Sequence, residues 1–382
     1  MASSSNSILF TSFFIVLCCD NVSANGCYQS IISFGDSISD TGNRQQLGTM
    51  YPDIGFDCAP PCSHDGRCSN GRLIVDFLAE SLGLPLITSY MNGKGNDGLV
   101  AGTNYAVSGA STLDSSFLKA GWSGNDVINA SLGVQLAWFK QSLPSMCGNT
   151  SDCRDYIGRS LIILGPFGSN DYNHMLTGGK VIDEVKPYVR LVVDVIISAV
   201  NELIEMGAKT IIVPGNFPWG CFPSVLTMYA SDGDEYDPTT SCLIKFNEFV
   251  EYHNTMLQTK LNQTRELSPN ATIIYADNYK ATMQIYLSPD EYGFTNSELL
   301  KACYGGGGPF NFNLSIKCGD PSMTMCDEPD THVSWDGIHF TEATYKLVAK
   351  NLFQGPYTRP EFYSLCPMPS APQMEVGLSS SM

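Results

Sequence analysis

Residues 187–215 read PYVRLVVDVIISAVNELIEMGAKTIIVPG, and this stretch decides the fold class. Apolar residues recur at helical spacing from Pro187 to Met206. Proline suits the first turn of a helix, and Gly207 ends the pattern. A β-branched run follows from Thr210 to Val213 and stops at Pro214-Gly215. The stretch therefore predicts a helix that leads into a buried strand, as in a βαβ unit.

The same alternation of strand and helix repeats along the chain. Short apolar runs predict strands over 31–34, 160–164, 210–213 and 272–275. Apolar residues at helical spacing predict helices over 72–82, 187–206, 246–261 and 341–352. Strands separated by helices favour a parallel sheet in a three-layer α/β domain. Because no repeat or linker divides the chain, we expect one domain.

The N-terminus is typical of a secretory signal peptide. Ile8 to Cys19 is apolar but short for a membrane span, and Val22-Ser23-Ala24 offers the small residues that signal peptidase requires. No later stretch predicts a transmembrane helix, so we expect no membrane insertion. The predicted organisation is a signal peptide over 1–24, one domain over 25–362 and a loosely ordered tail over 363–382.

Cysteines and glycosylation sequons agree with export. The chain has 14 cysteines, and two of them lie in the predicted signal, which leaves the even number of 12. Their spacing does not suit zinc, so disulfides are expected, with Cys147–Cys153 and Cys221–Cys242 as plausible pairs. Asn-x-Ser/Thr sequons predict exposed, glycosylated residues at Asn129, Asn149, Asn262, Asn270 and Asn313.

The chain is strongly acidic, with a formal net charge of -17. Such a chain repels phosphate backbones and anionic lipid, so nucleic acid and the cytoplasmic membrane surface are poor partners. The main physical consequence of the charge is solubility. It carries no information about the fold.

A serine follows the first predicted strand. In Phe34-Gly35-Asp36-Ser37, the Gly-Asp turn can present the Ser37 hydroxyl at the edge of the sheet. A hydroxyl becomes a strong nucleophile when a neighbouring base takes its proton. The alternative is a serine in an ordinary β-turn. Ser39 occupies the position of the second Gly in a Gly-x-Ser-x-Gly elbow, which argues against an α/β-hydrolase.

Asp336 and His339 offer the base and the acid that would orient it. Three residues apart, the carboxylate can accept a hydrogen bond from one imidazole nitrogen, and the other nitrogen can act as a base. The alternative is a simple polar contact in a loop. The chain has only five histidines, which strengthens the catalytic interpretation.

Two glycine-rich segments offer oxyanion donors. Residues 102–111 include Gly109, where small side chains would let a backbone N–H approach a substrate. Residues 165–172 include Asn170, which has a side-chain NH₂. Together with the N–H of Ser37, these groups could form an oxyanion hole, in which one donor contributes about 3–4 kcal/mol to catalysis. Each segment taken singly is an ordinary loop.

In this order, the four segments resemble the signature blocks of the SGNH hydrolases, and in particular the plant GDSL lipases/esterases. The family's Ser, Gly and Asn map onto Ser37, Gly109 and Asn170. Its Asp-x-x-His maps onto Asp336 and His339. The resemblance implies a flavodoxin-like α/β/α sandwich that performs serine-ester chemistry with no metal or organic cofactor.

The resemblance extends over roughly 30–362, with a few departures. Ile38 replaces the Leu of the GDSL motif, which is a mild apolar change. In the third block, Pro166 and Ser169 stand where the plant relatives usually have Glu and Gly. Because these positions flank Asn170, they bear on substrate choice and on the balance between water and another acceptor.

Three functions follow from these observations. The first is hydrolysis of a small-molecule ester, for which the plant resemblance favours an acyl ester of a specialised metabolite. The second is an acyltransferase that passes the acyl group to another hydroxylated acceptor. The third is a non-catalytic secreted glycoprotein that binds a ligand in the cleft, against which the complete residue set argues. Export implies an extracellular location or the vacuole, and the sequence makes no prediction of oligomeric state.

Overall fold

The computed structural model describes residues 26–50, 65–93, 102–121, 127–231, 233–316 and 319–367. The predicted signal peptide over 1–24 lies outside the described residues. The predicted tail begins too early at 363, because Phe362–Leu365 forms helix α15 and Cys366 is bonded to Cys27. The domain therefore continues through Cys366.

The core of the protein is a seven-stranded sheet in the order β2-β3-β1-β4-β5-β6-β9. Its pairings are parallel except that β9 runs antiparallel to β6 at one edge. Five neighbouring strands of the sheet are β3-β1-β4-β5-β6. When these five are renumbered by their order along the chain, their order in the sheet is 2-1-3-4-5. This is the flavodoxin-like order, which confirms the predicted fold. The strands are β1 (Ser30–Phe34), β2 (Thr88–Ser89), β3 (Thr103–Asn104), β4 (Ser160–Leu164), β5 (Thr210–Pro214), β6 (Thr272–Ala276) and β9 (Thr358–Arg359).

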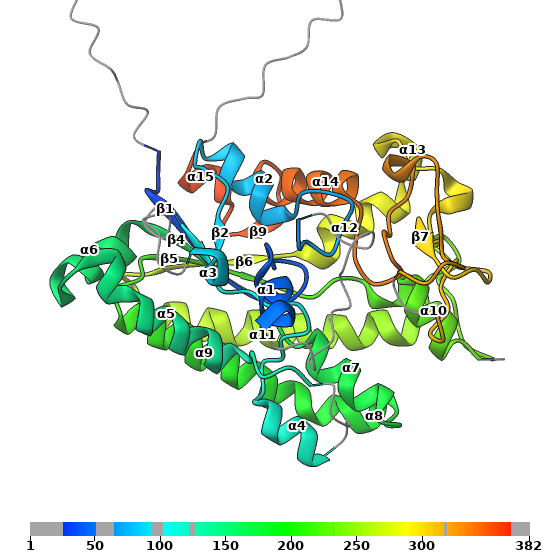
Figure 1. Ribbon diagram of the computed structural model, residues 1–382, viewed down its shortest axis with the longest axis horizontal. Coiled ribbons are helices and arrows are strands. Elements are labelled where there is room, and N and C mark those ends of the chain that lie inside the picture. The colour runs from blue at the N-terminus through cyan, green and yellow to red at the C-terminus, as the bar shows by residue number, and fades with distance from the viewer. Residues whose placement is uncertain are drawn as a thin grey trace, which may run out of the picture.

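Helices cover both faces of this sheet, which gives the three layers (Figure 1). One layer contains α5 (Leu132–Cys147), α9 (Val189–Glu205) and α11 (Ile244–Leu267). The other contains α2 (Ile74–Ser81), α12 (Asn278–Leu287), α14 (Glu342–Phe353) and α15. In α9, Val189, Val192, Val193, Ile196, Val200 and Leu203 are buried at helical spacing against the core. This burial explains why the opening sequence stretch forms a helix.

Shorter elements form the rim of the sheet and the connections. The remaining helices are α1 (Asn43–Met50), α3 (Tyr90–Gly93), α4 (Ser115–Gly121), α6 (Thr150–Arg159), α7 (Ser169–Thr177), α8 (Ile182–Val185), α10 (Pro223–Tyr229) and α13 (Pro289–Tyr292). A separate hairpin pairs β7 (Tyr304–Gly305) with β8 (Thr324–Met325). Among the described residues, none of these helices has the length and apolar character required to cross a membrane.

The register of the central strands brings their carboxyl ends together. Phe34 of β1 pairs with Leu164 of β4, and the Gly165 N–H donates to the Phe34 carbonyl at 2.9 Å. On the other side of β1, Ser33 pairs with Asn104 of β3. The loops after β1, β3 and β4 therefore emerge next to one another at the switch point, where ligands bind in such sheets.

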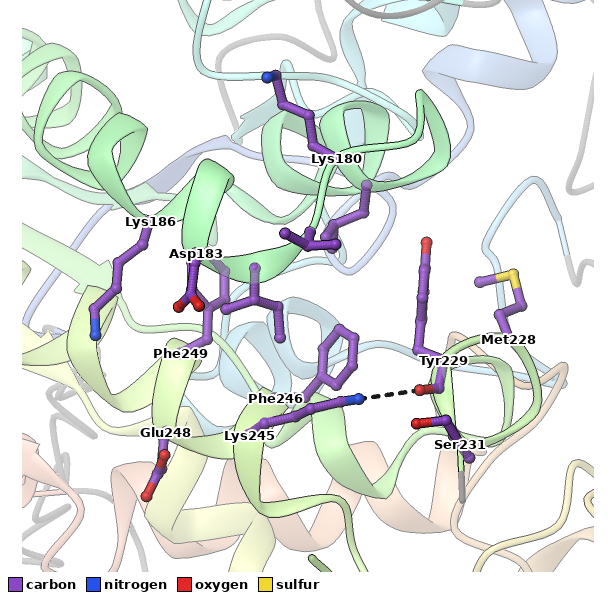
Figure 2. A pocket seen from close by; sticks show the side chains of 14 residues that line it. Lys180, Asp183, Lys186, Met228, Tyr229, Ser231, Lys245, Phe246, Glu248 and Phe249 are labelled. Atoms are coloured by element: carbon purple, nitrogen blue, oxygen red, sulfur yellow. Dashed lines mark hydrogen bonds between the residues drawn. The ribbon is translucent and has the colours of Figure 1, made fainter. Parts of the chain in front are cut away.

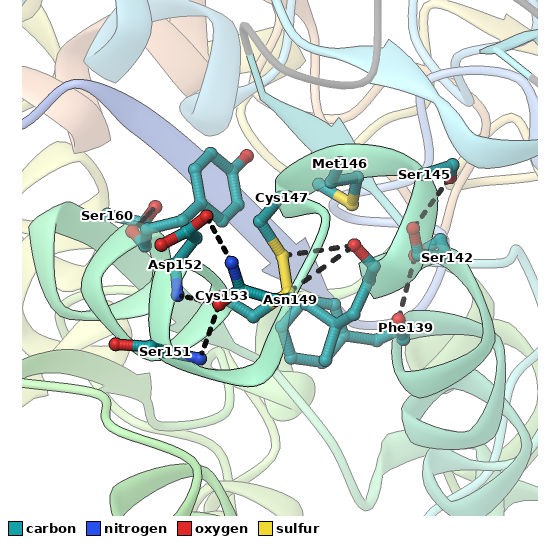
Figure 3. The surroundings of a disulfide bond; sticks show 12 residues. Phe139, Ser142, Ser145, Met146, Cys147, Asn149, Ser151, Asp152, Cys153 and Ser160 are labelled. Carbon is teal, nitrogen blue, oxygen red and sulfur yellow. Dashed lines mark hydrogen bonds between the residues drawn. A yellow bond between two sulfur atoms is a disulfide. The ribbon is translucent and has the colours of Figure 1, made fainter.

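Both disulfides expected from the sequence are confirmed. Cys147 is bonded to Cys153 and Cys221 to Cys242, and within the described ranges Cys303 is also bonded to Cys326 and Cys27 to Cys366. Figure 3 shows the first pair beside Asn149, whose side chain caps α6 by accepting from the N–H groups of Ser151 and Asp152. All five sequon asparagines are exposed, as glycosylation requires.

Two of these disulfides close loops of very different length and should differ in their effect on stability. Cys27–Cys366 spans 339 residues and Cys147–Cys153 spans six. Since a longer closed loop restricts the unfolded chain more, removal of the long bond should lower the free energy of unfolding by about 2–5 kcal/mol. Urea denaturation of Cys27→Ser/Cys366→Ser, beside Cys147→Ser/Cys153→Ser, measures the difference. An equal or smaller loss in the first variant would contradict the prediction.

Candidate active site

Side chains from distant parts of the chain meet in one cavity of about 310 Å³. Ser37 follows β1, Gly109 follows β3, Asn170 lies in the first turn of α7 after β4, and His339 precedes α14. All four line this cavity. The structure therefore brings together four of the five residues predicted from the sequence, and the fifth, Asp336, is hydrogen-bonded to His339.

The turn that carries Ser37 is held by its own backbone and by a distant glutamine. The N–H groups of Ser39 and Asp40 donate to the Asp36 carbonyl. Gln135 of α5 accepts from the Gly35 N–H at 3.0 Å and donates to the Gly35 carbonyl at 2.8 Å. A side chain at Gly35 would be crowded, because its Cβ would lie 3.0 Å from the Gly165 carbonyl oxygen. The turn is therefore fixed before any ligand binds.

Asp336 and His339 form a tight, oriented pair. His339 Nδ1 lies 2.6 Å from Asp336 Oδ2, and the His339 backbone N–H donates to Asp336 Oδ1 at 2.7 Å. Burial alone would raise the pKa of Asp336, but His339 and the N–H donors lower it below its ordinary value. An ionised Asp336 accepts the Nδ1 proton, so Nε2 is the proton-accepting atom of the ring.

The loop with Gly109 and the helix with Asn170 are joined directly. Gly109 has φ +82°, a backbone conformation that favours glycine. Asn170 Nδ2 donates to the Ala110 carbonyl at 2.9 Å. The neighbouring Asp171 carboxylate accepts from the N–H groups of Thr112 and Leu113 at 2.7 and 2.8 Å. These bonds set the position of the Asn170 amide relative to the Gly109 backbone.

The buried Asp40 joins the Ser37 turn to the Gly109 loop. Its carboxylate accepts four backbone N–H groups at 2.7–3.0 Å, from Gly42, Asn43, Arg44 and Ser108. Sequence reasoning missed this role. Asp-x-Gly is a visible turn signal, but the bond to Ser108 crosses 68 residues and has no local signature.

Three carboxyl groups lie buried around the site. Burial raises the pKa of Asp36 to about 7, and it raises the pKa values of Asp40 and Asp171 to about 6. Hydrogen bonds from backbone N–H groups oppose the rise in each case. The charge of these three carboxyl groups around Ser37 therefore changes with pH near neutrality.

The exposed walls of the cavity are mainly apolar, and several of the lining side chains are aromatic. The lining side chains include Phe217, Trp219, Phe222, Tyr229, Phe246 and Phe312. Arg44 and His174 also line it, and neither was among the predicted site residues. Ser169, which departs from the family pattern, donates its hydroxyl to Asn216 Oδ1 at 2.9 Å. The cavity can therefore hold an apolar or aromatic ester against a few polar groups.

One cluster has metal-binding residue types. Among the described residues, Cys303, Cys326 and His332 have ligand atoms within 4.8 Å of one another. Because the two cysteines form a disulfide, their sulfur atoms are not available as thiolates. His332 Nε2 lies 3.5 Å from Glu298 Oε2. This cluster is therefore a structural feature of the β7–β8 hairpin and not a metal site.

Comparison with known proteins identifies close relatives. The family model described as GDSL-like lipase/acylhydrolase matches residues 31–352. A GDSL esterase/lipase of Arabidopsis thaliana is 48% identical over 347 residues, covering 89% of this chain and 87% of the relative. Another from the same plant is 45% identical over 366 residues, covering 94% and 93%. The crystal structure of a phospholipase A1 from Streptomyces albidoflavus aligns with a TM-score of 0.33 and 13% identity, covering 85% of this chain and 99% of that one.

Replacement of Asp36 by asparagine should change how stability depends on pH. The folded-state pKa of Asp36, about 7, lies above the ordinary 3.8, so the folded protein binds the proton more tightly than the unfolded chain. This contribution to stability is present at low pH and is lost as pH rises from about 4 to 7.

Asp36→Asn should therefore gain stability relative to the unmodified protein across this window, by up to about 1.4 kcal/mol per pH unit. Urea denaturation between pH 4 and pH 8 measures the difference. Asp320→Asn is the control, because the pKa of this exposed carboxyl is lowered by its bonds to Ser322. A flat or opposite trend in Asp36→Asn would contradict the prediction.

Proposed function

The chain belongs to the GDSL-like lipase/acylhydrolase family and is a carboxylic-ester hydrolase, and we propose that Ser37 is its nucleophile. In this proposal His339 is the general base and Asp336 orients it. The observation that carries the proposal is that Ser37, Gly109, Asn170 and His339 line one cavity. The 2.6 Å contact between Asp336 and the His339 ring supports the assignment of the base.

Acylation begins when His339 Nε2 takes the Ser37 proton and Ser37 Oγ attacks the ester carbonyl carbon. The tetrahedral intermediate carries its negative charge on the former carbonyl oxygen. His339 then gives the proton to the leaving alcohol, and an acyl-serine remains. Water repeats the sequence in the second half and releases the acid. Asp336 stabilises the imidazolium that forms in each half.

The oxyanion hole consists of the backbone N–H groups of Ser37 and Gly109 and the Asn170 side chain. Asn170 supports this role because one of its amide hydrogens donates to Ala110, which orients the other. Donors fixed before the reaction stabilise the developing charge without reorganisation in the transition state. The Asp40 and Asp171 carboxylates accept hydrogen bonds from backbone N–H groups of this loop, and these bonds hold the loop rigid.

The substrate is an acyl ester of a plant specialised metabolite. Six aromatic side chains around a cavity of about 310 Å³ favour a compact ester with apolar or aromatic parts. The chain acts as one hydrolase domain from residue 25 through Cys366 after removal of a signal peptide over 1–24. Its destination is extracellular, with the vacuole as the alternative, and glycans attach at the five exposed sequons.

Replacement of Ser37 by alanine should remove both activity and active-site labelling. Without the hydroxyl no acyl-enzyme forms, so kcat on a p-nitrophenyl ester should fall by about 10⁴-fold or more. Asp336→Asn should lower kcat by a comparable factor, since the His339 tautomer is no longer fixed. A fluorophosphonate probe, read by mass spectrometry, tests the same serine.

Ser39→Ala is the matched control for Ser37→Ala. Ser39 lies in the same turn and donates its hydroxyl to the Gly165 carbonyl at 3.2 Å, which gives it no part in the chemistry. This variant should retain probe labelling. Equal labelling of Ser37→Ala and the unmodified protein, or no labelling of either, would overturn the assignment of the nucleophile.

The acyltransferase alternative shares the acylation half-reaction and differs only in the acceptor. Ser37 and His339 are less than a tenth exposed, which restricts the access of bulk water to the acyl-enzyme. Hydroxylated acceptors added with an ester donor would then form a new ester in place of free acid. Mass spectrometry of both products decides between the two. Unchanged acid release and no new ester with any acceptor would leave hydrolysis as the activity.

A further inference from the structure

A second cavity of about 540 Å³ lies next to the candidate active site. Its lining and that of the active-site cavity have four side chains in common, and we call these four residues the shared wall: Leu176, Met228, Tyr229 and Phe246. The second cavity, called the outer chamber here, is shown in Figure 2. Beyond the shared wall its lining includes the apolar residues Val181, Ile182 and Phe249.

The shared wall is held in place by defined contacts. The rings of Tyr229 and Phe246 pack with centroids 5.1 Å apart. Lys245 Nζ donates to the Tyr229 carbonyl at 3.2 Å (Figure 2). The same Lys245 Nζ pairs with Asp234 at 2.7 Å. Leu176 and Phe246 are buried, whereas Met228 and Tyr229 are half-buried. Tyr229 therefore lines both cavities, and its ring packs against that of Phe246.

Helix α10 links the shared wall to the segment that carries His339. The Ser224 N–H, at the start of α10, donates to the Gly337 carbonyl two residues before His339. Tyr229 ends the same helix five residues later, which is about 7.5 Å further along its axis. Since His339 protonates the leaving oxygen, the alcohol part lies at the His339 end. In the orientation that we adopt, the acyl part extends along α10 toward the shared wall.

We propose that the shared wall ends the acyl subsite and makes the enzyme selective for esters of short acyl groups. This inference rests on the proposed function of Ser37 and His339. An acyl chain that is longer than the subsite meets the Tyr229 and Phe246 rings and loses its alignment with Ser37. The outer chamber is the space that a longer chain would occupy if the shared wall were opened.

The test compares p-nitrophenyl butyrate with p-nitrophenyl octanoate, which have the same leaving group. The unmodified enzyme should prefer butyrate in kcat/KM. Tyr229→Ala opens the shared wall, so the octanoate-to-butyrate ratio should rise at least tenfold, because each newly buried methylene contributes about fourfold. A ratio is independent of the amount of folded enzyme. Met228→Ala, at a half-buried position, provides a second opening and should shift the ratio in the same direction.

Two controls separate this inference from its alternatives. Tyr229→Phe keeps the ring and should leave the ratio within twofold of the unmodified enzyme. Ile182→Ala alters only the outer chamber and should also leave it unchanged. The inference is overturned if neither opened variant shifts the ratio, or if the shift appears with alkyl acetates of increasing alcohol length and not with acyl length.

A failure of the acyl-length inference can be distinguished from a failure of the proposed function. Ser37→Ala should lose activity toward both esters whatever the role of the wall. If Ser37→Ala hydrolyses them as well as the unmodified enzyme does, the assignment of the nucleophile is wrong. If Ser37→Ala is inactive and the ratio stays constant in Tyr229→Ala and Met228→Ala, only the acyl-length inference is wrong.

Discussion

The candidate site depends above all on the parallel register of β1 and β4. Phe34 and Leu164 pair at the ends of these strands, and the Gly165 N–H bonds to the Phe34 carbonyl. This pairing brings the loop with Ser37 next to the loop with Asn170, although 133 residues separate them in sequence (170 − 37). Because side chains alternate along a strand, a slip of one residue would bury a different set of groups at this edge. The register of the sheet therefore determines where the loops that carry the site residues begin.

Around that edge, buried carboxylates and amides join the loops in addition to apolar packing. Asp40 and Asp171 each accept backbone N–H groups from the segment that contains Gly109. Gln135 performs the same task for Gly35. Burial of these acids opposes their ionisation, and the N–H donors offset part of that cost. Burial of these two acids lowers the stability of the domain near neutral pH, where they ionise. The same hydrogen bonds hold a rigid set of N–H groups around the proposed nucleophile.

The fold could be predicted, and the five candidate site residues could be named, because their signals are local. Residues 160–164 form β4 as expected, and residues 210–213 lie in β5. Helix α11 is longer than the predicted 246–261, since its polar C-terminal turns lack an apolar pattern. Strand β9 was missed because two residues carry no periodic signal. The bonds of Gln135 and Asp40 cross 100 and 68 residues, and such long-range pairings leave no trace in one sequence.

The residues proposed for catalysis have local sequence signals, whereas the residues that shape the cavity do not. Ser37, Gly109, Asn170, Asp336 and His339 lie in short motifs, so an ester-cleaving site is readable from the chain. The shape of the cavity is set by α7, α10 and α11, whose facing side chains come from separate segments and share no motif. The Tyr229 and Phe246 rings meet where the Cys221–Cys242 bond and the Leu243–Gly220 hydrogen bond join the segment before α10 to the start of α11. Selectivity can therefore change through these helices while the reacting groups stay where the sheet holds them.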